Sequence, residues 1–372
     1  MRVDEFILEN WLNPRDPLCK YNLGASCVKA FHVDELFEFL ALDVEEFLDE
    51  VRGMSLHYGR FDGSPRLRAA LAKQYQDIDA VDVLTVHGGT GANNLVMTEL
   101  IAPGDNVVVF MPNYQQHYSA PESFGVEVRK LWLDKETGYL PDLNRLESLV
   151  DDKTRMIIIT NPNNPTGSFI EEPMLRSICK IAGKHGAYVL SDEIYRGLAD
   201  RYMYSVVDIY EKGIATCSTS KVFSMAGTRI GWIVAKDPET RQRLFNRRSY
   251  DTICCGVFDE LITAIALENF EKILERSRGI VNESRAILDE WLTGEPRLHL
   301  GYRSYSTTAL VAYDYDIPTA EFCNNIYEKT GVLLCHGACF ELERVFRLGY
   351  GFGEPAHFKE ALAVLSEYLQ GL

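Results

Sequence analysis

The sequence has no long apolar segment, no excess of basic residues and no cysteine framework, and each absence excludes a class of protein. No apolar run approaches the ~20 residues of a membrane-spanning helix. Lysine and arginine number 38 against 54 acidic residues, a formal net charge of −16, which argues against a nucleic-acid-binding protein. The nine cysteines contain no Cys-x-x-Cys pair and are too few in 372 residues for a disulfide scaffold.

The composition that remains is that of an ordinary globular protein, 46% hydrophobic and 25% charged. The length predicts two domains, or one large core with a smaller lobe. The amino terminus, Met1-Arg2-Val3-Asp4-Glu5, carries acids where a signal peptide needs apolar residues, so we expect a reducing cytoplasmic location. Cys335 and Cys339 flank His336 but have no further ligand candidates, so no metal site is predicted.

From residue 81 onward, short β-branched runs alternate with amphipathic helical segments. Runs such as 107–109 and 157–159 are apolar at consecutive positions, which is typical of strands buried on both faces. We therefore predict an α/β domain with a mostly parallel sheet sandwiched by helices. Strands are expected at 81–86, 106–111, 126–133, 155–160, 187–190, 214–217 and 230–235, and helices at 143–150 and 172–185.

The carboxy-terminal part has a different pattern, which predicts a smaller α+β lobe. A helical stretch over about 257–291 is broken by Gly294-Glu295-Pro296. Short strands at 306–311, 332–334 and 345–348 and a terminal helix at 358–369 are expected after it. The first 45 residues precede the α/β pattern and are expected to pack on this lobe. The predicted large domain is 46–275, and the predicted small domain combines 1–45 with 276–372.

The segment Ser218-Thr219-Ser220-Lys221, with Arg229 beyond it, is the most informative motif. An enclosed lysine forms an imine with an aldehyde, and burial favours its neutral, nucleophilic form. A serine and an arginine nearby suit a phosphate on the same molecule. Pyridoxal phosphate is an aldehyde cofactor with a phosphate. Taken alone, the segment is more commonly a surface lysine followed by a strand.

Four further segments place polar or aromatic groups where predicted strands end. Taken in the order in which they are listed below, the first segment has glycines at a helix start, which favour an anion, and the second is a rigid loop that fixes an amide. The third has a buried carboxylate that needs a partner, and the fourth has an aromatic ring that can stack on a flat ligand. These segments are His87-Gly88-Gly89-Thr90-Gly91-Ala92, Asn161-Pro162-Asn163-Asn164-Pro165-Thr166-Gly167, Ser191-Asp192-Glu193-Ile194-Tyr195 and Pro112-Asn113-Tyr114. Each segment alone is also explained by a turn, a helix cap or packing.

The order and spacing of these motifs resemble the class I/II aminotransferases, the fold-type I group of pyridoxal-phosphate enzymes. The resemblance extends over roughly residues 56–352. It implies that Lys221 forms a Schiff base with the cofactor and that Asp192 pairs with the pyridine nitrogen. It further implies that Asn164 and Tyr195 bind the ring hydroxyl and that Tyr114 stacks on the ring. The implied phosphate ligands are Gly89, Thr90, Ser218 and Arg229.

The same resemblance implies residues for the substrate and for a second subunit. Arg347, in Phe346-Arg347-Leu348-Gly349-Tyr350, matches the arginine that binds the substrate α-carboxylate, with Asn164 beside it. Gly24 matches, more loosely, a backbone contact beside the substrate. Tyr58, in His57-Tyr58-Gly59, matches a tyrosine that reaches the phosphate of the partner subunit, so a homodimer with shared active sites is expected.

The implied reaction is amino-group transfer between an amino acid and a 2-oxo acid, with Lys221, Asp192 and Tyr195 as the catalytic residues. The same residues also serve a β-lyase, a decarboxylase or an elimination–cyclisation enzyme such as capreomycidine synthase, which the segments 8–12 and 331–334 faintly resemble. A transcription regulator with this domain is a non-enzymatic alternative, but about 45 non-basic residues before the domain leave no room for a DNA-binding module.

Substrate specificity is assigned only by region. The amino-terminal segment, the loop from Tyr114 to Tyr118 and a partner subunit are expected to contribute. Candidate residues near the site are Asp16, Cys19, Cys27 and Cys335, each also explained by packing or exposure. No second arginine is placed to bind a distal carboxylate, so a dicarboxylic substrate is not supported.

Overall fold

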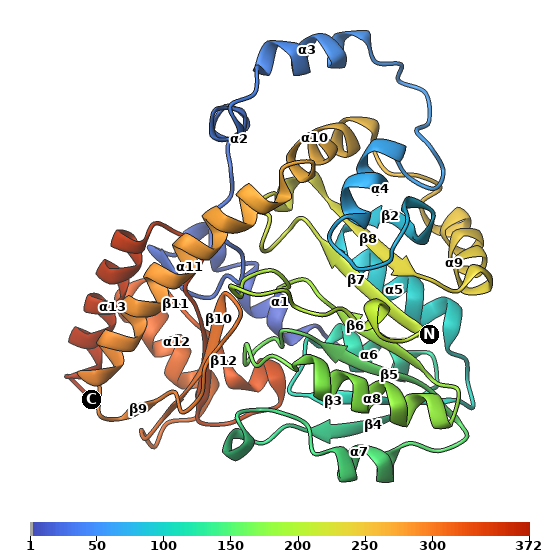
Figure 1. The fold of residues 1–372 in the computed structure, drawn as a ribbon. Helices are drawn as coiled ribbons and strands as arrows, with labels where there is room; N and C mark the ends of the chain where they lie inside the picture. The colour runs from blue at the N-terminus through green and yellow to red at the C-terminus, as the bar shows by residue number, and fades with distance from the viewer. Residues whose placement is uncertain (1–2) are drawn as a thin grey trace.

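The computed structural model describes residues 3–372, and its main element is a seven-stranded sheet (Figure 1). The strand order is β2-β8-β7-β6-β5-β3-β4. All neighbours are parallel except β8, which runs antiparallel to both β2 and β7. The strands are β2 (Val83–His87), β3 (Asn106–Met111), β4 (Glu127–Trp132), β5 (Thr154–Thr160), β6 (Tyr188–Asp192), β7 (Gly213–Ser218) and β8 (Ile230–Ala235). The predicted α/β fold with a mostly parallel sheet is confirmed.

Helices cover both faces of this sheet because its central strands contain consecutive apolar residues, which point to opposite faces. Val107 and Val109 of β3 belong to one core cluster, whereas Val108 and Phe110 belong to the other. On the first face lie α5 (Gly88–Leu100), α6 (Gln116–Ser123) and α9 (Pro238–Asp251). On the second face lie α4 (Pro65–Ala72), α7 (Leu143–Leu149), α8 (Glu172–Lys184) and α10 (Val257–Leu267).

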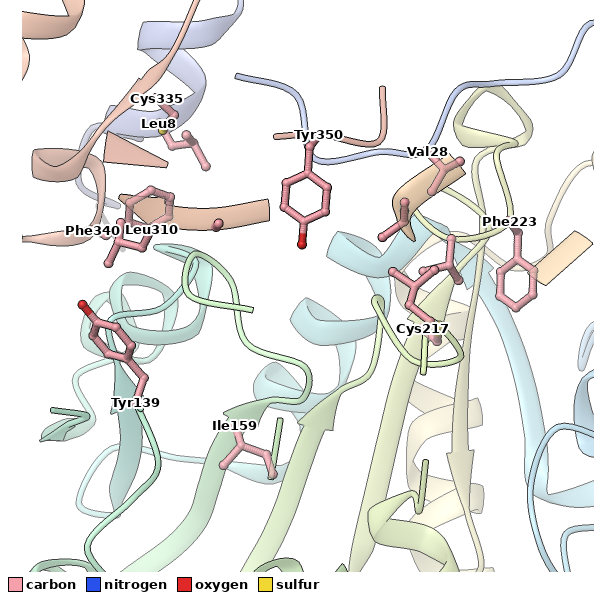
Figure 2. Packing of buried hydrophobic residues seen from close by; sticks show 14 of the residues in the cluster. Leu8, Val28, Tyr139, Ile159, Cys217, Phe223, Leu310, Cys335, Phe340 and Tyr350 are labelled. Carbon is pink, nitrogen blue, oxygen red and sulfur yellow. The ribbon is translucent and has the colours of Figure 1, made fainter. Parts of the chain in front are cut away.

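The carboxy-terminal lobe, residues 298–372, is built on a four-stranded antiparallel sheet of order β12-β13-β10-β9. Its strands are β9 (Leu298–His299), β10 (Thr308–Tyr313), β12 (Cys335–His336) and β13 (Val345–Gly349), and its helices are α12 (Thr319–Thr330) and α13 (Pro355–Leu369). One hydrophobic cluster joins this lobe to the large sheet: Figure 2 shows Ile159 and Cys217 of the sheet with Leu310 and Phe340 of the lobe. This shared core fixes the lobe against the sheet.

The amino-terminal residues divide between two neighbours. A short strand, β1 (Tyr21–Asn22), pairs with β11 (Val332–Leu333) of the lobe, and α1 (Ile7–Leu12) is tied to the lobe by a hydrogen bond from Trp11 Nε1 to the Leu334 carbonyl at 2.8 Å. In contrast, α2 (Val33–Leu40) and α3 (Val44–Gly53) extend outward and pack apolar side chains against α10 (Figure 1). The predicted domain boundaries remain a prediction.

The long helix predicted over 257–291 is wrong, because two helices occupy this stretch: α10 and α11 (Phe270–Thr293). Asn269 separates them with a backbone conformation of φ −115°, ψ 29°, and its side chain donates to the Ile265 carbonyl at 3.3 Å. This bond takes up a carbonyl at the end of α10, and asparagine competes well for such groups. The break at Gly294 is confirmed, since α11 ends at Thr293.

Within residues 3–372, none of the helices is both long and apolar enough to cross a bilayer. Residues 1 and 2, part of the amino terminus from which we predicted the absence of a signal peptide, lie outside the described residues.

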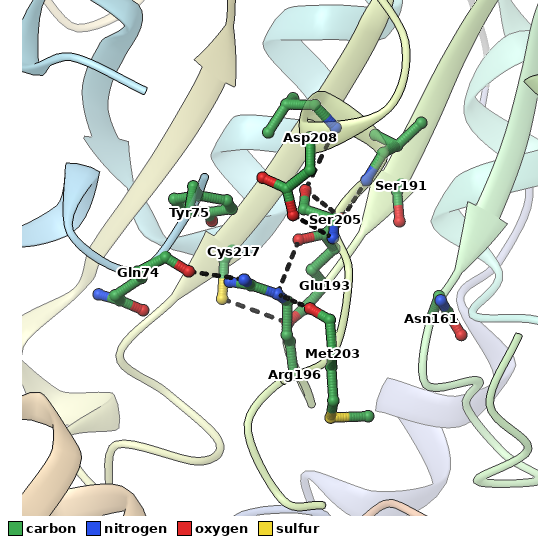
Figure 3. Close-up of polar contacts among 12 residues, drawn as sticks. Gln74, Tyr75, Asn161, Ser191, Glu193, Arg196, Met203, Ser205, Asp208 and Cys217 are labelled. Carbon is green, nitrogen blue, oxygen red and sulfur yellow. Dashed lines mark hydrogen bonds and ion pairs between the residues drawn. The ribbon is translucent and has the colours of Figure 1, made fainter. Parts of the chain in front are cut away.

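A buried ion pair supports the strand end that carries Asp192 (Figure 3). Glu193, the next residue, accepts a hydrogen bond from Ser205 Oγ at 2.7 Å and lies 3.7 Å from Arg196 Nε. Arg196 donates to the carbonyls of Met203 and Gln74, at 2.7 and 2.6 Å. Burial raises the pKa of Glu193 to about 7, against the opposing effect of Arg196. The pair therefore ties the loop after β6 to neighbouring segments.

This pKa predicts a pH-dependent contribution to stability. Between the ordinary value of 4.5 and about 7, folded Glu193 keeps a proton that the unfolded chain has lost, so its contribution is full at low pH and is lost as the pH rises. As the pH rises from about 5.5 to about 7, we expect the unfolding free energy of the wild type to fall by about 2 kcal/mol. The Glu193→Gln variant should not show this fall. Urea midpoints measured across this range test it; parallel curves for the two proteins would contradict it.

Candidate active site

A cavity of about 410 Å³ lies at the carboxyl ends of the central strands and extends to α1 and β13. Ten residues predicted from the sequence line it: Gly89, Thr90, Tyr114, Asn164, Asp192, Tyr195, Ser218, Lys221, Arg229 and Arg347. Their convergence follows from the topology, because parallel strands end at one edge of the sheet and their following loops meet there. Asp192 is the last residue of β6, and Ser218 is the last residue of β7.

Asp192 is buried, with 5% of its surface exposed, and both carboxylate oxygens have partners. Oδ2 accepts from Asn93 Nδ2 of α5 at 2.8 Å, and Oδ1 accepts from the Ile194 backbone N–H at 3.1 Å. The imidazole Nε2 of His117, on α6, lies 3.4 Å from Oδ2. The carboxylate is therefore held in one orientation while it faces the cavity.

The residues around Asp192 were missed from the sequence. His117 Nδ1 lies 3.0 Å from Asn113 Oδ1, which also accepts from Thr160 Oγ1 at 2.7 Å. Asn93 directly follows the glycine-rich segment 87–92, and this position is the one local feature from which its role could have been predicted. His117 and Thr160 come from separate elements, and nothing in their local sequence distinguishes them from core polar residues.

Lys221 faces the cavity with its Nζ 3.5 Å from Cys27 Sγ. Burial lowers the pKa of Lys221, but the negative charges that Cys27 and Tyr195 carry when ionised outweigh burial and raise it above the usual value. Burial acts as expected, since it favours the neutral amine, but in this arrangement its effect on the pKa is outweighed.

The start of α5 and Arg229 form an anion cradle. Gly88 has φ +67°, a conformation that favours glycine, and a Cβ there would lie 2.6 Å from Arg229 Nη2. A Cβ on Gly231 would lie 2.4 Å from the Gly88 carbonyl group. Arg229 donates to the Ala226 carbonyl at 3.0 Å and forms no ion pair in residues 3–372. Its charge and the free N–H groups of the helix start are available for an anion.

Arg347, on β13, carries a buried positive charge with only neutral partners. It is 1% exposed, donates from Nη1 to Asn164 Oδ1 at 2.9 Å and from Nη2 to the Gly24 carbonyl at 2.6 Å. Its Nε has no hydrogen-bond partner among the described residues. A buried guanidinium without a carboxylate is costly, so the site favours an anionic ligand group.

Helix α1 closes one side of the cavity and contributes a residue that the sequence analysis did not select. Tyr114, at the end of the loop after β3, donates from its hydroxyl to Glu9 Oε1 at 2.9 Å. Burial and the Glu9 carboxylate raise the pKa of Tyr114 well above its usual range, so the phenol remains protonated. Leu8 and Leu12 of the same helix also line the cavity.

The remaining predicted residues have different positions. Gly24 does not line the cavity, but its carbonyl contacts Arg347. Tyr58 lies on the surface, 63% exposed, outside the cavity of its own chain. Among the specificity candidates, Asp16 and Cys27 line the cavity. Cys335 is buried opposite Arg347 in the β12–β13 pairing, whereas Tyr118 is buried on α6 and Cys19 lines a separate cavity.

These donors fit pyridoxal phosphate. A lysine amine suits its aldehyde, the Asp192 carboxylate suits its pyridine nitrogen, and the cradle formed by α5 and Arg229 suits its phosphate. Asn164 and Tyr195 supply polar groups for the ring hydroxyl, and Tyr114 supplies an aromatic face.

Known proteins of one family are similar to this chain over most of its length. The family described as aminotransferase class I and II matches residues 43–365. A solved PLP-dependent aminotransferase from Streptococcus suis is 37% identical, with a TM-score of 0.96 over 100% of this chain and 98% of that chain. An aspartate aminotransferase from Streptomyces avermitilis is 32% identical over 78% of this chain and 76% of its own. Capreomycidine synthase from Streptomyces vinaceus is 25% identical over 97% of this chain and 93% of its own.

Proposed function

Because the chain belongs to the aminotransferase class I and II family, we propose that it transfers an amino group between an amino acid and a 2-oxo acid with pyridoxal phosphate as cofactor. One observation carries the proposal: Lys221, Asp192 and Arg347 come from separate strands or loops and line one cavity. They supply an amine, a fixed carboxylate and a buried cation, which are the three groups this reaction needs.

Pyridoxal phosphate, when bound, supplies an aldehyde for the amine and a ring that takes up negative charge. In this proposal, Arg229, Ser218 and the first turn of α5 hold the phosphate. Asp192, oriented by Asn93, keeps a proton on the ring nitrogen, and Asn164 with Tyr195 binds the ring hydroxyl.

Arg347 and Asn164 position the substrate. The guanidinium binds the α-carboxylate, and the amide oxygen of Asn164 orients the guanidinium through the bond at 2.9 Å. This binding fixes the Cα–H bond toward Lys221. The Lys221 amine, once released, takes the proton from Cα and later delivers a proton, as a general base and then a general acid.

A half-reaction experiment tests the proposal. The purified protein, loaded with cofactor, is mixed with single amino acids, and the released 2-oxo acid is measured by mass spectrometry. One oxo acid per active site, with recovery of the starting form on adding a second oxo acid, is the expected result. Release of ammonia with turnover in the absence of an acceptor would contradict amino-group transfer.

An elimination–cyclisation activity is the second candidate. The similarity to capreomycidine synthase favours it, because the match extends over 97% of this chain and 93% of that protein. The residues assigned above to the cofactor serve this chemistry equally, so product analysis separates the two candidates. Amino-group transfer releases a 2-oxo acid, whereas elimination followed by cyclisation expels the substituent on Cβ and keeps the α-amino group in the product.

Close packing of Gly231 on Gly88 predicts that a single methyl group weakens cofactor binding. Gly231→Ala would place its Cβ 2.4 Å from the Gly88 backbone and displace the phosphate-binding turn. We expect cofactor affinity to fall at least about tenfold, measured by fluorescence titration. Gly227→Ala is the matched control, because no atom lies within 4 Å of its Cβ. Equal affinities for the two variants would contradict the assignment of this turn.

Tyr58 predicts that the active site is completed by a second subunit. Its exposed hydroxyl lies outside its own cavity, so it reaches a phosphate only in a homodimer. We expect sedimentation velocity to give the mass of two chains and Tyr58→Phe to weaken cofactor binding several-fold. Tyr250→Phe, at another exposed tyrosine, is the control. A fully active monomer would refute the shared site.

A further inference from the structure

The cavity contains two carboxylates that the proposed function does not use. Its charged lining residues are Lys221, Arg229, Arg347, Asp192, Glu9 and Asp16. The proposed function assigns the three basic residues to the cofactor, its phosphate and the substrate α-carboxylate, and it assigns Asp192 to the cofactor ring. Glu9 and Asp16 remain without a charged partner, and neither forms an ion pair with a basic side chain in residues 3–372.

Glu9 is held in position from two sides. The Tyr114 hydroxyl donates to its carboxylate at 2.9 Å. The helix that carries Glu9 is anchored by hydrogen bonds from the Ile7 backbone to Gln115 Oε1 at 2.9 Å and from Gln115 Nε2 to the Glu5 carbonyl at 2.8 Å. Among residues 3–372, only one of its two oxygens has a hydrogen-bond partner, so the other is available to a ligand.

Asp16 is connected to the substrate end of the same cavity. Its carboxylate accepts from Asn22 Nδ2, and Asn22 Oδ1 accepts from the backbone N–H groups of Gly24 and Ala25 at 3.0 and 2.8 Å. The Gly24 carbonyl in turn accepts from Arg347 at 2.6 Å. Asp16 therefore lies on the segment that also positions the arginine.

Arg347 is an independent indication that this cavity takes a ligand. Its guanidinium is 1% exposed, its Nε is unpartnered among the described residues, and its two hydrogen bonds go to neutral oxygens. A ligand carboxylate would satisfy it. The rest of a ligand whose carboxylate binds Arg347 must lie within this cavity. Apart from the residues that the proposed function uses, the charged residues that line the cavity are Glu9 and Asp16.

We propose that the substrate is an amino acid whose side chain ends in a cation, a guanidinium or an ammonium group, which Glu9 and Asp16 receive. The inference rests on the proposed function, because that function assigns the other charged residues. A side chain ending in a carboxylate is repelled by the same two acids, whereas a neutral side chain gains no charge interaction with them. The cavity therefore discriminates between side chains by their charge.

Unreactive ligands test this inference separately from the reaction. The probes are 5-guanidinopentanoate, its neutral analogue 5-ureidopentanoate, 6-aminohexanoate and glutarate, which all lack the α-amino group. Calorimetry with the cofactor-loaded protein is expected to show at least about tenfold tighter binding of the guanidino or amino probe than of the ureido probe, and weakest binding of glutarate. Equal affinity for the guanidino and ureido probes, or preference for glutarate, would overturn the inference.

Charge-removing variants identify the residues involved. Glu9→Gln and Asp16→Asn each keep the side-chain shape, and each is expected to reduce the preference for the cationic probes about three- to tenfold. Glu5→Gln is the matched control, because it removes the same charge from an exposed residue that does not line the cavity. A preference unchanged in both cavity variants would refute the assignment.

The outcomes also separate this inference from the proposed function. If the cationic probes bind selectively but no amino acid releases an oxo acid, the reaction assignment fails and the cationic subsite stands. If amino acids with neutral or acidic side chains react best and the probes show no charge preference, the subsite fails and amino-group transfer stands.

Discussion

Lys221→Ala is expected to abolish amino-group transfer and the covalent attachment of the cofactor. In the proposed mechanism the amine bonds to the aldehyde and moves the Cα proton, and no other lysine lines the cavity within residues 3–372. Losing both roles should reduce the rate by at least about 10⁴-fold. Borohydride reduction followed by peptide mass spectrometry should find the pyridoxyl group on residue 221 in the wild type and on no residue in the variant.

Lys212→Ala is the matched control for this result. Lys212 is also partly buried, but its Nζ donates to the Gly186 carbonyl at 2.8 Å, away from the cavity. The control should keep the label and the activity of the wild type. A label that persists at another lysine after Lys221→Ala would refute the assignment of the whole site.

Arg347→Met is expected to reduce kcat/KM for amino acids by about 10²- to 10³-fold without destabilising the fold. Removing one partner of a buried, hydrogen-bonded charge pair usually costs 2–5 kcal/mol of binding, roughly this range. The ligand-free protein should lose little, because its buried guanidinium pairs only with Asn164 and the Gly24 carbonyl. Steady-state kinetics and thermal unfolding of the same preparation therefore separate a binding role from a structural role.

Two further variants sharpen this test. Arg344→Met removes an exposed arginine three residues away that pairs with Asp316, and it should leave kcat/KM unchanged. Arg347→Lys keeps the charge but loses the planar, bidentate geometry, and it should recover only part of the activity. A Tm that falls sharply in Arg347→Met, with an unchanged KM, would show that Arg347 is structural.

The strands of the large sheet were predictable because their signal is local. Each is a short run of apolar, β-branched residues between turn residues, and β3 and β8 have the predicted limits. The order of strands was not predictable in the same way. Strand β8 follows β7 in sequence but lies between β7 and β2, antiparallel to both, because it returns to close the sheet beside the first strand.

The division of the predicted long helix also lay beyond the sequence pattern. The apolar periodicity continues through residue 269, and only the bond from the Asn269 side chain to the Ile265 carbonyl shows where α10 ends. In the same way, α2 and α3 carry amphipathic patterns that do not indicate their partner. Their apolar side chains pack on Leu261 and Ile265 of α10, a contact decided by the path of the chain.

The sequence by itself determined the motifs whose order and spacing are readable along the chain. Asp192 ends β6, Asn164 and Lys221 lie in the loops after β5 and β7, and Arg347 lies on β13. Only the tertiary structure decided what surrounds them. Glu9 lies 105 positions from Tyr114 in the sequence, yet it accepts a hydrogen bond from the Tyr114 hydroxyl. His117, on α6, lies beside Asp192, which ends β6. Such contacts depend on how separate helices and strands pack together. This packing is decided by the burial of apolar side chains throughout the fold, so residues that are neighbours in the sequence do not reveal it.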